Sequence, residues 1–313
     1  MADIIVTGGA GFIGSNLVDK LLDEGYSVAV MDDLSTGNKA NLPESIRLHR
    51  VDIRSAVVRR VFSIEKPKYL FHLAAQLNVR KSVADPVFDC DVNVMGIINL
   101  LEAAREYDVE KVIFTSTGGA IYGEQEYFPA DEKHPTNPES PYGITKLTSE
   151  KYLQFYYRTH GLKYNIFRLA NIYGPRQSTV GEAGVVAAFY DRLIAGDDAI
   201  INGEGNQTRD FVYVGDVVDA LIKGLKYPDC DIFNIGTATE TTVVELFRIM
   251  RDISGSDQEE KFGPGKPGEQ IRSVITYDKA KEKLGWEPRV DIKTGLEKTY
   301  EYFKRKHEIA ASV

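Results

Sequence analysis

The sequence predicts an α/β fold built on a doubly wound parallel sheet with a second, smaller mixed α/β domain. In the first half, short apolar runs alternate with helical stretches, a glycine-rich segment follows the first run, and an acidic residue ends the second. Alternation of this kind favours a parallel sheet covered by helices on both faces. The carboxyl ends of such strands then form the edge at which ligands bind.

Six strands are expected in this half, because each short apolar run is bounded by polar or turn-forming residues. They cover residues 3–8, 27–32, 46–53, 69–75, 111–117 and 163–169. The first connecting helix carries Ile13, Leu17 and Leu21 at i+4 spacing and ends near Gly25, a typical C-terminal cap. The pattern loosens after Gly174, where glycine and polar clusters separate helices expected at 184–195, 214–226 and 243–254. Residues 1–174 are therefore predicted as one domain and 175–313 as another, with some segments returning to the first.

Composition limits the function classes. The 313 residues carry a net charge of -8 and a pI of about 5.3, which argues against a general affinity for nucleic acid. No apolar run is long enough to cross a bilayer, and the N-terminus enters a strand without a signal-peptide pattern. Cys90 and Cys230 are isolated, and the five histidines lack metal-ligand spacing. We expect a cytoplasmic protein without a metal, a nucleic-acid partner or a membrane partner.

The glycine-rich segment Thr7–Gly14 lies between the first strand and the first helix. Its glycines Gly8, Gly11 and Gly14 permit a tight turn, and they let backbone N–H groups approach a pyrophosphate at the helix N-terminus. A turn alone would also use glycines, but this position in the fold favours a dinucleotide. The segment thus predicts a Rossmann-type cofactor site.

Asp32 ends the second strand and is followed by Asp33, with no arginine or lysine before Lys39. A carboxylate there can hydrogen-bond the ribose hydroxyls of NAD and repel the 2′-phosphate of NADP. The segment is also rich in turn formers, which is the alternative interpretation. We predict NAD as the cofactor.

Ser140 and Pro141 are typical of a helix start, and Tyr142 and Lys146 then fall at i and i+4 on one helical face. An ammonium near a phenol favours the phenolate, which can act as a base. Thr115, Ser116 and Thr117 offer hydroxyl groups at the end of the fifth predicted strand. Strand-end hydroxyls can equally satisfy local backbone groups.

Taken together, these segments resemble the extended short-chain dehydrogenase/reductase family. The likeness runs through His72–Ala75, Arg168–Gln177, Gly181–Phe189, Arg209–Val217, Phe233–Gly236 and Lys283–Pro288, and so spans nearly the whole chain. It implies an NAD-dependent 4-epimerase that interconverts UDP-glucose and UDP-galactose through a 4-keto sugar, with the N-acetyl sugars as further substrates. It also implies a homodimer formed through the helix that bears Tyr142.

The resemblance assigns roles to individual positions. It makes Tyr142 the base, Lys146 its activating cation and Thr117 the hydroxyl that bonds the sugar O4, with Ser116 as a rival. The residues implied in NAD binding are Gly8, Gly11, Phe12, Ile13, Gly14, Asp32, Asp33, Ser35, Thr36, Gly37, Asp52, Ile53, Leu73, Ala74, Ala75, Asn93, Tyr142 and Lys146. The residues implied in binding the UDP-sugar are Ser116, Thr117, Asn171, Val186, Asn202, Arg209, Arg272 and Ser273, the two arginines on its diphosphate.

Other functions stay open on the sequence. A 4,6-dehydratase of this family would carry an Asp-Glu pair where this chain has Gly118 and Gly119, and a decarboxylase would carry a glutamate near Ala120. A UDP-glucuronate 4-epimerase would place an arginine at Ser178. A non-catalytic NAD-binding regulator would have no use for the Tyr142 and Lys146 pair. Ser273 is small, which is expected to admit an N-acetyl group beside the sugar C2.

Overall fold

The computed structural model describes residues 1–179, 184–265 and 270–311. The first three residues of the motif Gly181–Phe189 therefore lie outside the described residues. The backbone divides into two compact units that each combine several chain segments. Unit 1 comprises residues 1–123, 135–169 and 218–233, and unit 2 comprises residues 124–134, 170–217 and 234–313.

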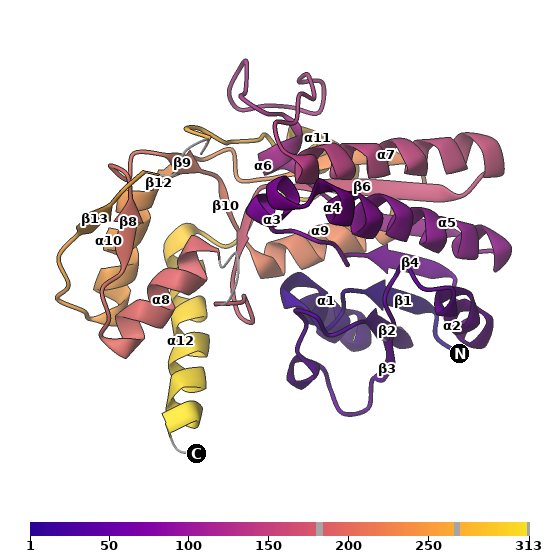
Figure 1. The fold of residues 1–313 in the computed structure, drawn as a ribbon, viewed down its shortest axis with the longest axis horizontal. Helices are drawn as coiled ribbons and strands as arrows, with labels where there is room; N and C mark the ends of the chain where they lie inside the picture. The colour runs from indigo at the N-terminus through magenta and orange to yellow at the C-terminus, as the bar shows by residue number, and fades with distance from the viewer. Residues whose placement is uncertain (180–183, 266–269, 312–313) are drawn as a thin grey trace. The chain divides into compact units, whose positions relative to one another are not determined.

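Unit 1 is built on a seven-stranded sheet with the order β11-β6-β5-β4-β1-β2-β3 (Figure 1). Its strands are β1 (Ile4–Thr7), β2 (Val28–Asp32), β3 (Arg47–Arg50), β4 (Tyr69–His72), β5 (Lys111–Thr117), β6 (Lys163–Leu169) and β11 (Asp231–Ile235). The six strands from β1 to β6 pair in parallel, and Thr7 is in register with Met31 on one side and His72 on the other. Parallel strands place their carboxyl ends at one edge, which is where the predicted site residues of this unit gather.

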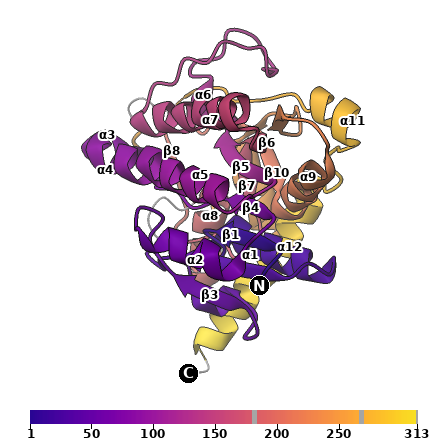
Figure 2. The same cartoon turned by 90° about the vertical axis from the view of Figure 1, so that its right-hand side faces the viewer.

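Helices cover both faces of this sheet (Figure 2). Their bounds are α1 (Phe12–Asp23), α2 (Val57–Glu65), α3 (Val79–Ala84), α4 (Pro86–Cys90), the π-helix η2 (Asp91–Met95), α5 (Gly96–Glu106), α6 (Gly118–Ile121), α7 (Pro141–His160) and α9 (Val214–Lys226), with a short 3₁₀ turn η1 (Lys39–Asn41). Apolar side chains of the strands pack with α2, α5 and α7 into one buried cluster. On the opposite face α1 contacts β1 and β2. Helix α9 approaches β6 so closely that a Cβ at Gly224 would lie 2.2 Å from the Phe167 ring.

Unit 2 contains short strands and four further helices. They are β7 (Asn171–Tyr173), α8 (Val185–Ala195), β8 (Ile200–Asn202), β9 (Thr208–Arg209), β10 (Phe211–Tyr213), β12 (Thr241–Thr242), α10 (Val243–Ser254), β13 (Lys261–Gly263), α11 (Asp278–Leu284) and α12 (Ile292–Ala311). The strands pair two by two, as β10 with β7, β12 with β9 and β13 with β8. Helices α8, α10 and α12 surround a core that contains Tyr190, Phe247 and Phe303.

The predicted fold class is confirmed, and all six predicted strands are present. In the seven-stranded sheet, the strand that sequence reasoning missed is β11, whose residues Asp231–Phe233 return to unit 1 after α9. The short strands of unit 2 were not predicted either. The three helices predicted in the second half correspond to α8, α9 and α10. Among the helices of the described ranges, none combines the length and apolar character that a bilayer crossing requires.

Candidate active site

The glycine-rich turn between β1 and α1 is closed by contacts that exclude side chains. Gly8 has a φ of +68°, and a Cβ there would lie 2.7 Å from the Ala74 nitrogen. A Cβ at Gly14 would lie 2.1 Å from the Gly8 carbonyl oxygen. Gly11 is the N-cap of α1 and supplies no capping side chain, so the N-terminal N–H groups of Phe12 and Ile13 keep the positive end of the helix dipole. This cradle fits the pyrophosphate of a dinucleotide.

Asp32 is buried at the carboxyl end of β2, where both of its oxygens accept backbone hydrogen bonds. The Ala10 N–H donates to Oδ2 and the Leu34 N–H donates to Oδ1, each at 2.9 Å. Burial raises the pKa of Asp32, while these two hydrogen bonds lower it. A Cβ at Gly37 would lie 2.7 Å from Asp32 Oδ1, so glycine is what lets the loop close over the carboxylate.

The remaining residues predicted for the cofactor follow the ends of β2, β3 and β4. Asp33 accepts hydrogen bonds from Ser35, which like Thr36 is exposed. Asp52 is held by the guanidinium of Arg54, and Ile53 is buried against Gly96. After β4, the N–H groups of Leu73 and Ala74 both point to the Thr7 hydroxyl at 3.3 Å, and Ala75 follows half-buried.

Helix α7 begins as the sequence predicts. Ser140 is the N-cap, and its hydroxyl accepts a hydrogen bond from the Gly143 N–H at 3.1 Å, while Pro141 is the first helical residue. Tyr142 is half-buried one turn before Lys146, and its backbone N–H donates to Ser82 Oγ at 3.2 Å. The two side chains of the predicted base and its cation therefore lie on one face of a well-capped helix.

Lys146 lies in a buried and largely apolar environment. Its Nζ is 4.2 Å from the centroid of the Phe114 ring, and Phe114 stacks on His72 at 5.5 Å between ring centroids. Burial lowers the pKa of Lys146 to about 7, with Glu150 and Asp89 opposing the shift. Burial, with a further contribution from Lys146, lowers the pKa of His72 to about 3, so this imidazole is neutral. A lysine tuned in this way is typical of a functional site.

The hydroxyl groups at the end of β5 have different surroundings. Ser116 is buried and donates to Glu150 Oε1 at 2.6 Å. Thr117 is half-buried, precedes α6 as its N-cap, and makes no side-chain capping bond. Adjacent strand residues face opposite sides, so the two hydroxyls cannot share one role.

Asn93, predicted to line the cofactor, is almost fully buried in the π-helix η2. Its Oδ1 accepts from the Gln76 N–H at 2.9 Å, and its Nδ2 donates to the Gln76 carbonyl oxygen at 2.9 Å. The same Nδ2 is 3.2 Å from both Asp89 Oδ1 and Thr145 Oγ1. In this conformation Asn93 ties the segment after β4 to α7.

Four of the residues predicted for the UDP-sugar come close together in unit 2. The Asn171 N–H donates to the Asp210 carbonyl oxygen at 2.9 Å, and the Asp210 N–H donates to the Ser273 carbonyl oxygen at 3.0 Å. Arg209 is half-buried and ends β9, directly before Asp210, and Ser273 is buried. Arg272 forms a two-pronged ion pair with Glu240, with Nε 3.0 Å from Oε2 and an Nη nitrogen 2.5 Å from Oε1.

The other two residues predicted in unit 2 have different contacts. Asn202 ends β8, and its carbonyl oxygen accepts from Gln207 Nε2 at 3.1 Å. Val186 on α8 is buried in the apolar core of unit 2.

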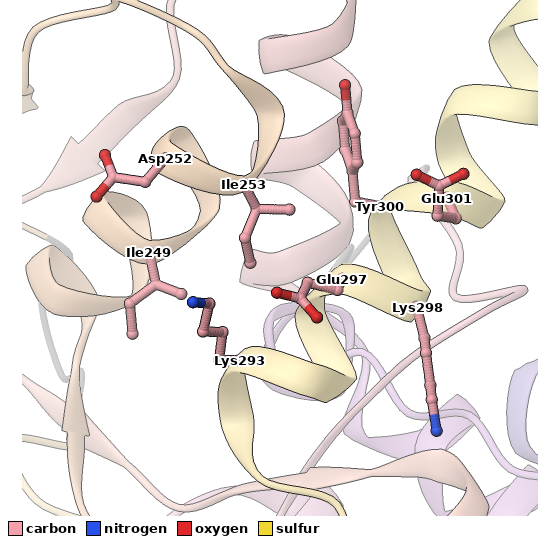
Figure 3. Close-up of a pocket in the computed structure, with 8 residues that line it drawn as sticks. All are labelled: Ile249, Asp252, Ile253, Lys293, Glu297, Lys298, Tyr300 and Glu301. Carbon is pink, nitrogen blue, oxygen red and sulfur yellow. The ribbon is translucent and has the colours of Figure 1, made fainter.

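No group of metal-ligating side chains occurs in the residues that the structure describes. A separate hollow of unit 2 lies between α10 and α12 and is lined by Ile249, Asp252, Ile253, Lys293, Glu297, Lys298, Tyr300 and Glu301 (Figure 3). It carries mixed charges, and none of these lining residues belongs to the predicted site.

Sequence reasoning missed the buried polar groups that surround α7. Glu150 and Arg168 form an ion pair that also contacts Ser116 and Tyr122. Glu150 lies four residues after Lys146, so helical spacing was a signal that could have found it. Asp89 is four residues before Asn93, but its other two partners, Gln76 and Thr145, are distant in sequence and gave no such signal.

Comparison with known proteins shows the family. The family model described as the NAD dependent epimerase/dehydratase family matches residues 4–236. A UDP-glucose 4-epimerase of Mycolicibacterium smegmatis is 43% identical over 310 residues, covering 97% of this chain and 99% of that protein. A crystal structure of a UDP-glucose 4-epimerase with UDP-glucose from Thermotoga maritima is 48% identical with a TM-score of 0.95, covering 97% of this chain and 99% of the other.

A UDP-glucose 4-epimerase of Thermus thermophilus in complex with NAD is 42% identical, with a TM-score of 0.91, and covers 96% of this chain and 98% of the other. These likenesses extend over both units. The chain belongs to the NAD-dependent epimerase/dehydratase family, and its cofactor is NAD.

Proposed function

We propose that this protein is a UDP-glucose 4-epimerase, which interconverts UDP-glucose and UDP-galactose by inverting C4. The observation that carries the proposal is the buried Lys146 one helical turn from Tyr142, on a helix fixed by its Ser140 cap. Proteins that share 42% to 48% of this sequence over nearly its full length are UDP-glucose 4-epimerases. A protein that only binds NAD has no need of a base and its activator.

In the proposed reaction Tyr142 removes the proton from O4 and later returns it. Lowering a phenol pKa from about 10 to about 7 requires roughly 4 kcal/mol of preference for the anion. The Lys146 ammonium supplies part of this, because the two groups share a sheltered helical face where charges interact strongly. The glycine cradle and Asp32 would hold NAD, which would supply a reversible hydride acceptor for C4. The keto sugar would flip over in the site between loss and return of the hydride, so the reaction causes no net redox change.

We assign the hydroxyl that bonds O4 to Thr117. What supports this choice is that the Ser116 hydroxyl already donates to the buried Glu150 at 2.6 Å. Moving Ser116 onto a substrate would leave a buried carboxylate short of a donor, which costs about 1–3 kcal/mol. Thr117 is the N-cap of α6, and its side chain makes no capping hydrogen bond that binding a substrate would break.

For the nucleotide part we assign Arg209 and Arg272 to the diphosphate, with Asn171, Asn202, Val186 and Ser273 around the uridine and sugar. Arginine matches phosphate oxygens with two parallel hydrogen bonds. Arg272 already uses two nitrogens on Glu240, which holds its guanidinium in a fixed plane. Apart from Thr117 and Asn171, the residues that bind the nucleotide sugar would then lie within 175–313, while residues 1–174 would hold NAD.

We further propose a homodimer formed through α5 and α7. Support comes from apolar side chains on the exposed surface of α7, namely Ile144, Phe155 and Tyr157. A cytoplasmic location fits the two free cysteines, of which Cys90 is exposed.

The test of the activity is a substrate panel followed by NMR of the products. The purified protein is incubated with UDP-glucose, UDP-galactose, their N-acetyl forms and UDP-glucuronate. We expect UDP-glucose and UDP-galactose to reach the same equilibrium mixture from either side. A 4-keto-6-deoxy sugar would instead indicate a dehydratase, and no conversion of any sugar by the NAD-loaded protein would refute the proposal.

A further inference from the structure

Asp89 on α4 is a fully buried carboxylate for which the proposed chemistry has no use. Three donors meet it: Gln76 Nε2 at 2.7 Å and Asn93 Nδ2 at 3.2 Å on Oδ1, and Thr145 Oγ1 at 2.7 Å on Oδ2. In the part of the chain that the structure describes, Asp89 forms no ion pair with an arginine or lysine. Burying a carboxylate without a contacting cation costs free energy, so the presence of Asp89 at this position needs an explanation.

The donors connect Asp89 to the catalytic helix. Thr145 lies on α7 directly before Lys146 and three residues after Tyr142, and its hydroxyl is the group that reaches Asp89. Asn93 and Gln76 bind each other through both backbone groups of Gln76, which fixes the segment after β4 against the π-helix. Asp89 therefore accepts hydrogen bonds from three segments: the one that follows β4, the π-helix η2, and helix α7, which bears Tyr142 and Lys146.

The charges around Lys146 give Asp89 a second role. Two buried carboxylates act on this lysine, Glu150 and Asp89, while the Phe114 ring contacts its ammonium and His72 is neutral. The charge of Glu150 is matched by Arg168, whose Nη nitrogen is 2.7 Å away. Among the described residues no arginine or lysine pairs with Asp89 in this way, so its charge acts on the lysine without a contacting cation to neutralise it.

We propose that Asp89 is a positioning residue for the epimerase reaction: its fixed negative charge keeps Lys146 protonated, and its bond from Thr145 sets how α7 presents Tyr142 and Lys146. Asp89 touches neither substrate nor cofactor, and it acts through the lysine and the helix. The role rests on the proposed function, because it supposes that a protonated Lys146 stabilises the Tyr142 phenolate.

The first experiment measures kcat and KM against pH for the wild type and Asp89→Asn. The amide keeps the shape and at least two of the three contacts but removes the charge. We expect kcat to fall about tenfold and the alkaline limb of the profile to move about one unit toward lower pH, since Lys146 loses its proton earlier. KM should change little. Asp23→Asn, an exposed aspartate at the end of α1, is the matched control for the same loss of charge.

The second variant separates position from charge and remains usable if Asp89→Asn does not fold. Thr145→Val removes the hydroxyl that binds Asp89 but leaves the carboxylate in place. It should lower kcat while the alkaline limb stays where the wild type has it. A purely structural role would instead lower the melting temperature of both variants and leave the pH profile and kcat of the folded fraction unchanged, and that result would overturn the proposal.

The third measurement does not depend on turnover. Protein labelled with carbon-13 at the lysine ε position is titrated by NMR, and the Lys146 signal is identified by its loss in Lys146→Met. Asp89→Asn should shift the titration of that signal to lower pH, and Asp23→Asn should not. An unshifted titration rejects the role of Asp89 even if the wild type is an active epimerase. A shifted titration in a protein that converts no UDP-sugar refutes the proposed function instead.

Discussion

Arg168 on β6 binds both carboxylate oxygens of Glu150 on α7, with Nε 3.0 Å from Oε1 and an Nη nitrogen 2.7 Å from Oε2. Both side chains are almost fully buried, at 4% and 0% exposed. Because Glu150 also accepts from Ser116 and Arg168 also contacts Tyr122, the pair connects β5, β6 and α7 beneath Lys146.

We predict that Arg168→Met destabilises the protein by about 3–5 kcal/mol, because Glu150 is left charged and buried without its partner. Arg105→Met is the control, since Arg105 pairs with Glu102 at the surface, where solvent screens the interaction between the two charges. Urea unfolding followed by circular dichroism measures both. If both variants lose the same free energy of unfolding, the buried pair contributes no more to stability than the surface pair. Adding Glu150→Leu to Arg168→Met should recover much of the lost stability.

Tyr142→Phe should reduce kcat by at least about a hundredfold, because general base catalysis typically contributes 10²–10⁴-fold. The fold and NAD affinity should be retained, since only a hydroxyl at the half-buried start of α7 is removed. Steady-state assays and a calorimetric NAD titration measure the two properties separately. Turnover at the wild-type rate would show that Tyr142 is not the base.

NAD should bind at least about tenfold more tightly than NADP, which requires only about 1.4 kcal/mol of repulsion between Asp32 and the 2′-phosphate. Asp32→Asn should reduce the ratio of NAD affinity to NADP affinity, although this variant also loses one of the hydrogen bonds from Ala10 and Leu34. Fluorescence titration with both nucleotides measures it, with Asp23→Asn as the control for net charge. Equal affinities in the wild type would refute Asp32 as the selector.

The local features of unit 1 followed from the sequence because their causes are local. Ser140 and Pro141 start α7 where the sequence predicted it, and the glycines of the first turn sit where side chains would collide. Strand β11 (Asp231–Ile235) was missed because it lies in the second half of the chain, where glycine and polar clusters loosen the alternation of strands and helices. The boundary between the units was beyond sequence patterns as well, since residues 124–134 and 218–233 cross between units through tertiary contacts.

The candidate site also contains some residues that local sequence patterns reveal and others that only tertiary contacts reveal. Tyr142 and Lys146 could be paired from their i,i+4 spacing alone. The sequence left Ser116 and Thr117 as rivals, and the proposal of Thr117 depends on the tertiary bond from Ser116 to Glu150. Asp89 accepts from Asn93, which is four residues away, but also from Gln76 and Thr145, which only tertiary structure brings to it.

The stability of unit 2 should depend on pH through Asp210. Burial raises the pKa of Asp210 to about 6, against the hydrogen bonds from Thr237 that lower it. Since the ordinary value is 3.8, the folded state holds the proton more tightly between about pH 4 and pH 6. The contribution of this carboxyl is therefore full below about pH 4 and is lost as the pH rises through about 6, up to about 3 kcal/mol.

Urea unfolding of the wild type and Asp210→Asn at pH 4, 5, 6 and 7 tests this. The stability of the wild type relative to the variant should fall over that range, because every other carboxyl is common to both proteins. A relative stability that stays constant or grows with pH would contradict the shift at Asp210.

Ser273 should decide whether N-acetyl sugars are accepted. It is buried at 4% exposed, next to Arg272 and bonded through its carbonyl oxygen to the Asp210 N–H at 3.0 Å. That backbone bond fixes where its side chain begins, so a larger residue must project into the space beside it. In Ser273→Tyr the ring should exclude the acetamido group, since overpacking costs about 1–3 kcal/mol and about 1.4 kcal/mol is a tenfold change.

The assay compares kcat/KM for UDP-glucose and UDP-N-acetylglucosamine in the wild type, Ser273→Tyr and Ser273→Ala. The wild type and the alanine variant should use both sugars, and the tyrosine variant should lose the N-acetyl substrate at least about tenfold more than UDP-glucose. The alanine variant controls for the hydroxyl, because it keeps the space but removes the polar group. If the tyrosine variant still uses the N-acetyl sugar, or the wild type ignores it, the gate lies elsewhere than at Ser273.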